Sequence, residues 1–322
     1  LGLSLLTRLT EGKIWLCTAP DWEITLPGIN RVSRVSFAGP HPASLPGTHM
    51  HVLQPVGPDR TNWHMNYQDV SALEAGIDSL VFISSTRKHT IYDHFSPDFE
   101  LEDRLERARK TDLLQAIKDI VPARVDRVYV TQPEALGLGH AILCAERVIG
   151  DEPFAILLAD DMVKNEGRGA LSQMISVYEQ TGASVIGVEE VPPEKTRSYG
   201  IVGVQKNPAG HYAIQTMVEK PAPEDAPSNL GIIGRYVLDP AVFRHLHTVG
   251  KGSGGEIQLT DGIAAMLEKH PVLALPLEGE RYDCGSRHGF IEATIKYAID
   301  HDDIRDDMLE HMAALLKAHG RI

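Results

Sequence analysis

The chain has 322 residues, of which 43% are hydrophobic and 23% charged, and its formal net charge is −13. This is ordinary globular composition, and the acidic balance argues against a general nucleic-acid binder, which would hold phosphates with lysine and arginine. No apolar run approaches the roughly 20 residues of a membrane-spanning helix. The three cysteines form no C-x-x-C pair, so neither a zinc site nor a disulfide framework is indicated, and a reduced, cytoplasmic compartment is expected.

Residues 1–66 differ in character from the rest of the chain. They contain all three tryptophans, show no sustained hydrophobic period and carry turn signals such as Pro46-Gly47. Only residues 13–18 and 31–37 resemble strands. From Tyr67 onward helical and strand patterns alternate, so we predict an atypical N-terminal segment over 1–66 and a separate domain over 67–322.

Apolar runs of strand length alternate with helical patterns in the first part of this domain. The expected strands cover 79–84, 125–131, 154–158 and 183–188, and the expected helices cover 69–75, 87–95, 97–120, 139–148 and 167–181. This order predicts an α/β fold with a mixed, mostly parallel central sheet and helices on both faces. Ligands of such sheets bind at the carboxyl ends of the strands, where Gln132 and Asp160 fall. The rest of the chain is more mixed, with strands expected over 199–204, 211–217, 231–238 and 272–276, and helices over 257–269, 289–301 and 304–319.

A polar, glycine-rich motif follows the strand expected over 125–131. It consists of Gln132 and then Leu136-Gly137-Leu138-Gly139-His140. A glutamine amide donates and accepts hydrogen bonds in one plane, as the edge of a pyrimidine base requires, and the glycines allow backbone amides to approach a base or a phosphate. A plain strand–loop–helix turn explains the glycines as well, and His140 is expected in a solvated or capping position.

Two carboxylate motifs stand far apart in the sequence. Asp160-Asp161 follows an apolar strand, and Asp283 precedes Cys284-Gly285. A carboxylate at a strand end can hold Mg²⁺ or can cap the next helix. Because Asp283 provides a second such context, we predict that Asp160 and Asp283 share one metal ion beside phosphate groups.

A third motif, Glu219-Lys220-Pro221, closes a strand. Lysine can bind a phosphate as a point charge, the glutamate can accept hydrogen bonds from sugar hydroxyls, and Gly200 would let a sugar approach the backbone. The alternative is an exposed ion pair at a strand end. The stretch 254–261 is interpreted as a loop that opens a helix, for which simple capping is a sufficient explanation.

Together these motifs closely resemble the bacterial UTP–glucose-1-phosphate uridylyltransferases, from about Tyr67 to the C-terminus. The most specific segments are 75–77, 92–95, 136–141, 157–161, 226–230, 234–236, 255–261 and 282–285. The resemblance implies a Rossmann-like nucleotidyltransferase domain with a sugar-binding region and C-terminal helices. It implies that UTP and glucose 1-phosphate give UDP-glucose and pyrophosphate with Mg²⁺ as cofactor, in a homo-oligomer (dimer or tetramer) without nucleic-acid or membrane partners.

Carried over position by position, the resemblance assigns uracil to Gln132 and Gly137, Mg²⁺ to Asp160 and Asp283, glucose to Gly200 and Glu219, and the sugar's phosphate to Lys220. Asp160, Lys220 and Asp283 are then the expected catalytic residues. The sugar phosphate attacks the α-phosphorus of UTP directly, so catalysis consists of positioning and charge neutralisation, without a covalent enzyme intermediate.

The resemblance breaks on the N-terminal side. The family opens with a strand, the string G-x-G-T-R-x-x-P-x-T-K and a P-K-E-M-L segment, and neither string occurs here. The most similar stretch, residues 54–60, keeps Pro-Val-Gly and Arg60 but lacks the glycine loop and both lysines. Because this loop would cradle the triphosphate, we predict UDP-glucose binding with weak or absent turnover.

Two interpretations from different classes follow. One is an active uridylyltransferase in which Arg60 or another basic residue of 1–66 supplies the missing cation. The other is a non-catalytic or impaired sugar-nucleotide-binding relative. A dehydrogenase is less well supported, because no G-x-G-x-x-G follows a strand with an acidic residue about 20 positions later.

Overall fold

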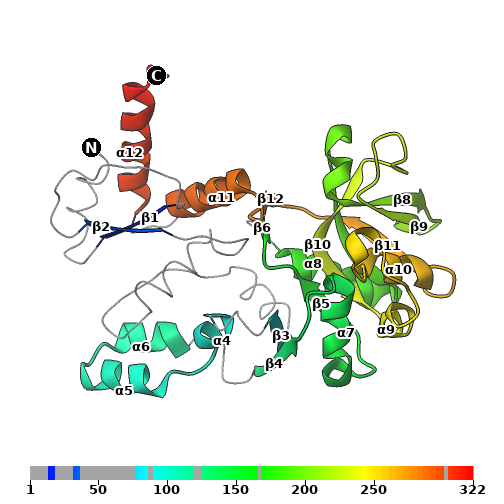
Figure 1. The fold of residues 1–322 in the computed structure, drawn as a ribbon, viewed down its shortest axis with the longest axis horizontal. Helices are drawn as coiled ribbons and strands as arrows, with labels where there is room; N and C mark the ends of the chain where they lie inside the picture. The colour runs from blue at the N-terminus through cyan, green and yellow to red at the C-terminus, as the bar shows by residue number, and fades with distance from the viewer. Residues whose placement is uncertain are drawn as a thin grey trace. The chain divides into compact units, whose positions relative to one another are not determined.

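The structure, a computed structural model, describes residues 14–18, 32–36, 77–85, 90–118, 125–165, 168–300 and 304–321. The chain divides into two compact units, one from residues 1–65 and 89–120 and the other from residues 66–88 and 121–322. Figure 1 draws the elements of both, and each unit is described by itself. Residues 54–60, which were compared with the family's glycine loop, and the helix expected over 69–75 lie outside the described residues.

The described residues of the first unit form a pair of strands and three helices. They are β1 (Ile14–Thr18), β2 (Val32–Ser36), α4 (Thr90–Phe95), α5 (Phe99–Arg107) and α6 (Thr111–Lys118). The strands pair in parallel. The Asp98 side chain caps α5 by accepting a hydrogen bond from the Leu101 N–H. The single helix expected over 97–120 is wrong, because Arg109 takes a left-handed φ of 55° between α5 and α6.

The second unit is built on a six-stranded sheet with the strand order β5-β10-β7-β11-β9-β8. These strands are β5 (Phe154–Leu157), β7 (Ser184–Glu190), β8 (Gly200–Lys206), β9 (Tyr212–Glu219), β10 (Leu230–Leu238) and β11 (Val272–Pro276). Two further pairs are β3 (Ser79–Ser85) with β4 (Asp126–Gln132), and β6 (Asp161–Lys164) with β12 (Glu280–Asp283). No sequence pattern predicted β6 or β12.

Helices cover both faces of the six-stranded sheet. The helices that the structure describes in this unit are α7 (Leu138–Ile149), α8 (Ala170–Thr181), α9 (Ala241–Leu246), α10 (Leu259–Met266), α11 (Arg287–Asp300) and α12 (Arg305–Ala318), with short 3₁₀ turns η1 (Pro193–Ser198) and η2 (Ser253–Gly255). Successive strand residues point to opposite faces. Val185 therefore packs with Leu171 and Met174 of α8, whereas Ile186 packs in the larger cluster to which α7, α9 and α10 contribute.

The expected α/β class with a mixed central sheet is confirmed. In the six-stranded sheet β7 and β11 pair in parallel, whereas β10 is antiparallel to β5 and β7, and β8 is antiparallel to β9. Crossover helices produce parallel pairs, while a tight turn produces an antiparallel hairpin. The β8–β9 pair is such a hairpin, with its turn at 207–210. Across the sheet, β5, β7, β8 and β11 run in one direction, and β9 and β10 run in the other.

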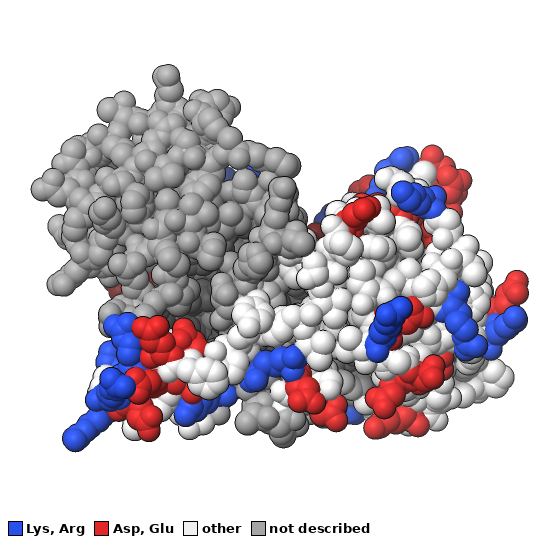
Figure 2. Space-filling view, turned by 60° about the horizontal axis from the view of Figure 1, so that its bottom comes forward, with Lys and Arg blue, Asp and Glu red and all other residues white. Residues whose placement is uncertain are grey.

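The surface carries mixed charge. On the face drawn in Figure 2, acidic and basic side chains intermix over the described residues. Asp103 and Arg107 of α5, for example, form an ion pair of 2.8 Å one helical turn apart. Among the described residues, no helix combines the length and apolar character that crossing a membrane requires.

Candidate functional site

The pairing of β6 with β12 brings two distant motifs together. In this antiparallel pair Asp283 lies opposite Asp161. Beyond the pair, the backbone N–H of Cys284 donates a 2.7 Å hydrogen bond to the carbonyl oxygen of Asp160. The strand end that carries Asp160 and the turn that follows Asp283 are therefore one local structure.

The carboxylates of Asp160 and Asp283 border a common point at Gly285. A Cβ atom on Gly285 would lie 3.1 Å from Oδ1 of Asp283 and 3.2 Å from Oδ2 of Asp160, and the Gly285 N–H donates to Asp283 Oδ1 at 3.0 Å. Burial raises the pKa of the neighbouring Cys284 thiol, and the charges of Asp283, Asp161 and Asp160 raise it further. Two carboxylates thus converge, and the absence of a side chain at position 285 keeps the space beside them open.

Adjacent aspartates have different surroundings. Asp160 is exposed, whereas Asp161 is buried. Oδ1 of Asp161 accepts hydrogen bonds from Nε, at 2.7 Å, and Nη2 of Arg281. Nη2 of the buried Arg235 donates to the Asp161 carbonyl oxygen, and its Nη1 donates to the Leu158 carbonyl oxygen. Burial raises the pKa of Asp161, and the Arg281 charge opposes this. Asp161 therefore anchors the loop while Asp160 faces solvent.

The candidate base-reading residue Gln132 is held by its own loop. Its Nε2 donates to the Gly137 carbonyl oxygen and to Nδ1 of His140, both at 3.1 Å. His140 thus orients Gln132, a role that the solvated or capping interpretation missed. Gly137 has φ 100°, and a Cβ atom there would lie 2.7 Å from the Glu256 Cβ. Both the backbone conformation and the close packing at position 137 favour glycine over any residue with a side chain.

The candidate sugar-binding residues converge around Glu219. Gly200 pairs with Glu219 across β8 and β9, and a Cβ atom on Gly200 would lie 3.2 Å from Glu219 Oε2. That oxygen accepts a 2.7 Å hydrogen bond from Thr260 Oγ1, and Oε1 lies 3.6 Å from the exposed Lys220 Nζ. Burial, followed by the Glu219 charge, raises the pKa of Asp261. The structure thus brings Gly200, Glu219 and Lys220 together.

The stretch 254–261 connects the base-reading loop to the sugar-binding residues. The Gly139 N–H donates to the Ile257 carbonyl oxygen at 2.9 Å, and three residues later Thr260 donates to Glu219. Gln258, at the N-cap of α10, makes no side-chain capping hydrogen bond. Capping is therefore the wrong interpretation of this stretch, and Thr260 is a residue that sequence reasoning missed.

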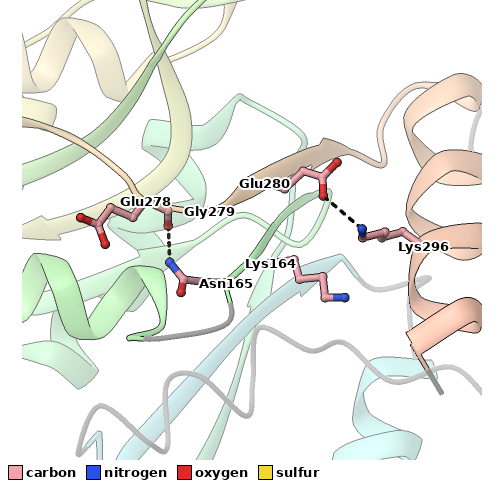
Figure 3. Close-up of a pocket in the computed structure, with 6 residues that line it drawn as sticks. All are labelled: Lys164, Asn165, Glu278, Gly279, Glu280 and Lys296. Atoms are coloured by element: carbon pink, nitrogen blue, oxygen red, sulfur yellow. Dashed lines mark hydrogen bonds and ion pairs between the residues drawn. The ribbon is translucent and has the colours of Figure 1, made fainter. Parts of the chain in front are cut away.

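A pocket of about 380 Å³ lies at the opposite end of the β6–β12 pair. Figure 3 shows the residues that line it: Lys164, Asn165, Glu278, Gly279, Glu280 and Lys296. Its two lysines have acidic partners, because Lys296 lies 3.8 Å from Glu280 and Lys164 is paired with Asp300. None of the predicted site residues lines this pocket. We place the candidate site at the other end, where the motif residues converge.

The carboxylates of Asp160 and Asp283 fit a small divalent cation. Mg²⁺ takes oxygen ligands and is usually bound by one or two carboxylates, with waters and substrate phosphates completing its shell. The described residues contain no group of three or more His, Cys, Asp or Glu side chains arranged for a metal. A metal here would thus depend on these two carboxylates and on oxygens from a phosphate ligand.

Two family models match the chain. Residues 62–299 match the model described as nucleotidyl transferase. Residues 1–76 match the model described as NqrA second alpha/beta domain. The second match covers the part of the chain in which the expected phosphate-loop strings are missing.

Individual proteins support the first match. The UTP–glucose-1-phosphate uridylyltransferase of Bacillus subtilis (strain 168) is 44% identical over 245 residues, which are 76% of this chain and 83% of that protein. A UTP-bound UGPase from Acinetobacter baumannii has a TM-score of 0.70 and 39% identity, covering 77% of this chain and 86% of its own. A UDP-glucose pyrophosphorylase complexed with UDP-glucose has a TM-score of 0.66 and 37% identity, covering 73% of this chain and 86% of its own.

Proposed function

Because the chain belongs to the family of UTP–glucose-1-phosphate uridylyltransferases, we propose that it catalyses the reaction of UTP with glucose 1-phosphate to give UDP-glucose and pyrophosphate. The observation that carries this proposal is the β6–β12 pairing, which sets Asp160 and Asp283 around one point. A phosphate-binding lysine and a glutamate suited to sugar hydroxyls accompany them in the same unit. The relatives supply the identity of the nucleotide and of the sugar.

Each site residue then has a proposed role. Gln132 and Gly137 read uracil, Gly200 and Glu219 contact glucose, Lys220 binds the sugar's phosphate, and Asp160 and Asp283 hold Mg²⁺. The metal supplies neutralisation of the phosphate charge when it is bound. Thr260 and Lys220 flank the Glu219 carboxylate on its two oxygens, so this side chain is preorganised to accept from a hydroxyl group. We also propose a nucleotidyltransferase domain over 67–322, a homo-oligomer and a cytoplasmic location.

A second candidate function is binding of the sugar nucleotide with impaired or no catalysis. It is favoured by residues 1–66, which lack both phosphate-loop strings and match the model of another family. The proposed binding residues all lie in the second unit, so they are independent of that segment's sequence.

The reaction is tested by identifying its product. The chain is incubated with UTP, glucose 1-phosphate and Mg²⁺ at enzyme concentrations equal to those of the substrates, and in the reverse direction with UDP-glucose and pyrophosphate. Mass spectrometry should identify UDP-glucose in the first case and UTP in the second. ATP and galactose 1-phosphate serve as competing substrates. If neither product forms while UDP-glucose still binds, the second candidate function holds.

Replacing Lys220 is expected to weaken UDP-glucose binding. Lys220→Ala removes a charge-assisted bond to phosphate, which corresponds to about 1.5–3 kcal/mol in calorimetry. Lys220 has a left-handed φ of 47°, so Lys220→Asn is the better-matched variant, because asparagine tolerates this conformation. Lys206→Ala, at an exposed position of the same hairpin, is the control. Unchanged affinity in both Lys220 variants would place this lysine on the solvated surface.

Replacing Gln132 is expected to affect only the base. Gln132→Glu keeps the size of the side chain but replaces the amide, so its two Nε2 hydrogen bonds to the loop are lost along with the base contact. Both Gln132→Glu and Gln132→Ala should weaken uridine and thymidine nucleotides and leave glucose 1-phosphate binding unchanged in titrations. Gln205→Ala, on the exposed part of β8, serves as the control. An equal loss for glucose 1-phosphate would contradict the base-reading role.

A further inference from the structure

Arg281 connects several elements from a largely buried position. It lies on β12, two residues before Asp283, and its side chain is 10% exposed. Nε and Nη2 donate to Asp161, while Nη1 donates to Glu189 Oε1 at 2.6 Å and to the Tyr199 hydroxyl at 3.1 Å. The guanidinium group also lies 5.1 Å from the centre of the Tyr199 ring. The planar fork of arginine donors suits such a multiple role.

One end of this network holds the metal-binding loop. Arg281 binds the side chain of Asp161, which directly follows Asp160, and Arg235 binds the carbonyl oxygen of the same residue. The Asp160 carbonyl oxygen accepts from Cys284, next to Asp283. The backbone on both sides of the Asp160 side chain is therefore held in place, which limits the positions that its exposed carboxylate can reach.

The other end of the network holds the phosphate-binding lysine. The Tyr199 carbonyl oxygen accepts a 3.0 Å hydrogen bond from the backbone N–H of Lys220, the residue with the left-handed φ of 47°. Tyr199 also precedes Gly200, and it packs over Gly231. A Cβ atom added to Gly231 would lie 3.4 Å from the Cβ atom of Tyr199. The position of the Tyr199 ring and the conformation of the chain at Lys220 are thus linked.

We propose that Arg281 is a positioning residue that, through Tyr199, couples the carboxylates at Asp160 and Asp283 to Lys220. The inference rests on the proposed function, in which one ligand spans both places: Mg²⁺ and Lys220 bind phosphate oxygens of the same sugar nucleotide. A rigid link between the carboxylates and Lys220 makes metal binding favour sugar-phosphate binding. Sugar-phosphate binding then favours metal binding by the same factor, because binding linkage is reciprocal.

The test measures this coupling as the ratio of the UDP-glucose Kd without Mg²⁺ to the Kd with Mg²⁺. For the parent chain we expect a ratio of about 5 or more, within the usual range of such couplings. Tyr199→Phe removes only the hydroxyl group and should reduce the ratio to about 2 or less while leaving the melting temperature nearly unchanged. Arg281→Lys keeps the charge, but the ammonium group cannot reproduce the planar fork, and the ratio should fall in the same way. Tyr212→Phe, at an exposed tyrosine of β9, should leave it unchanged.

The outcomes separate the coupling role from a merely structural one. If the variants weaken UDP-glucose equally with and without Mg²⁺, the network only supports the fold and the inference is overturned. If Arg281→Lys does not fold, Tyr199→Phe decides alone. If the parent chain does not bind UDP-glucose at all, both the proposed function and this inference fail, whereas parent binding with a coupling that no variant changes overturns only the inference.

Discussion

The purified chain is expected to bind UDP-glucose and yet to release pyrophosphate at least about 100-fold more slowly than the Bacillus subtilis relative assayed beside it. A loss of this size is seen when charge-stabilising donors are removed from an active site. Binding and turnover are expected to depend on different parts of the chain. The proposed contacts to uracil, glucose and the sugar's phosphate come from the second unit. The cradle for the leaving pyrophosphate would come from residues 1–66.

The composition of residues 54–60 explains this expectation. A phosphate-binding loop needs glycines for close approach of backbone N–H groups and a nearby cation. Gly57-Pro58-Asp59 offers one glycine, a proline without an N–H and a carboxylate that repels phosphate. Arg60 is the remaining cation of the stretch. The match of residues 1–76 to another family's model agrees with the absence of this loop.

A chimaera provides the control. Residues 1–66 are replaced by the corresponding N-terminal segment of the Bacillus subtilis relative, and both chains are compared in calorimetry with UDP-glucose and in a pyrophosphate-release assay. The graft should raise turnover toward that of the relative, while the UDP-glucose Kd changes little. Turnover by the parent chain as fast as that of the relative would contradict the prediction, and another basic residue must then supply the missing charge.

Removing either proposed metal ligand is expected to have the second large effect. Asp160→Asn and Asp283→Asn each keep the size of the side chain but remove an anionic ligand, so kcat should fall by about 100-fold or more, since the metal neutralises phosphate charge. Affinity for uridine, which carries no phosphate, should stay within about 3-fold, because metal and base contacts are separate. The measurement is steady-state kinetics against Mg²⁺ concentration, with the chimaera used if parent turnover is low.

Two other aspartates serve as controls. Asp151→Asn, at an exposed position between α7 and β5, should leave kinetics and stability unchanged. Asp161→Asn should lower the melting temperature instead, because the largely buried Arg281 loses one of its charged partners, Glu189 being the other. Equal losses of uridine affinity and kcat in Asp160→Asn would show that Asp160 maintains the fold rather than the metal.

The sequence by itself predicted most of the elements and indicated the candidate site residues. Strands such as β4, β7 and β11 appear within two residues of their expected ends, because their alternating or continuous apolar patterns are local properties of the chain. Gln132, Asp160 and Lys220 were predicted because polar residues at strand ends are local signals too. The break between α5 and α6 at Arg109 was missed, since the helical charge pattern continues through it.

Only the tertiary structure decided how these residues meet. Strands β6 and β12 have four residues each, too short for a periodic pattern, and each is paired as a strand with the other. Once β12 is known, Arg281 falls on the same side of the strand as Asp283 and diagonally across from Asp161, a relation that no spacing along the sequence could show. The opposite surroundings of Asp160 and Asp161 arise in the same way, because the buried charge of Arg281 compensates only the carboxylate that the fold turns toward it.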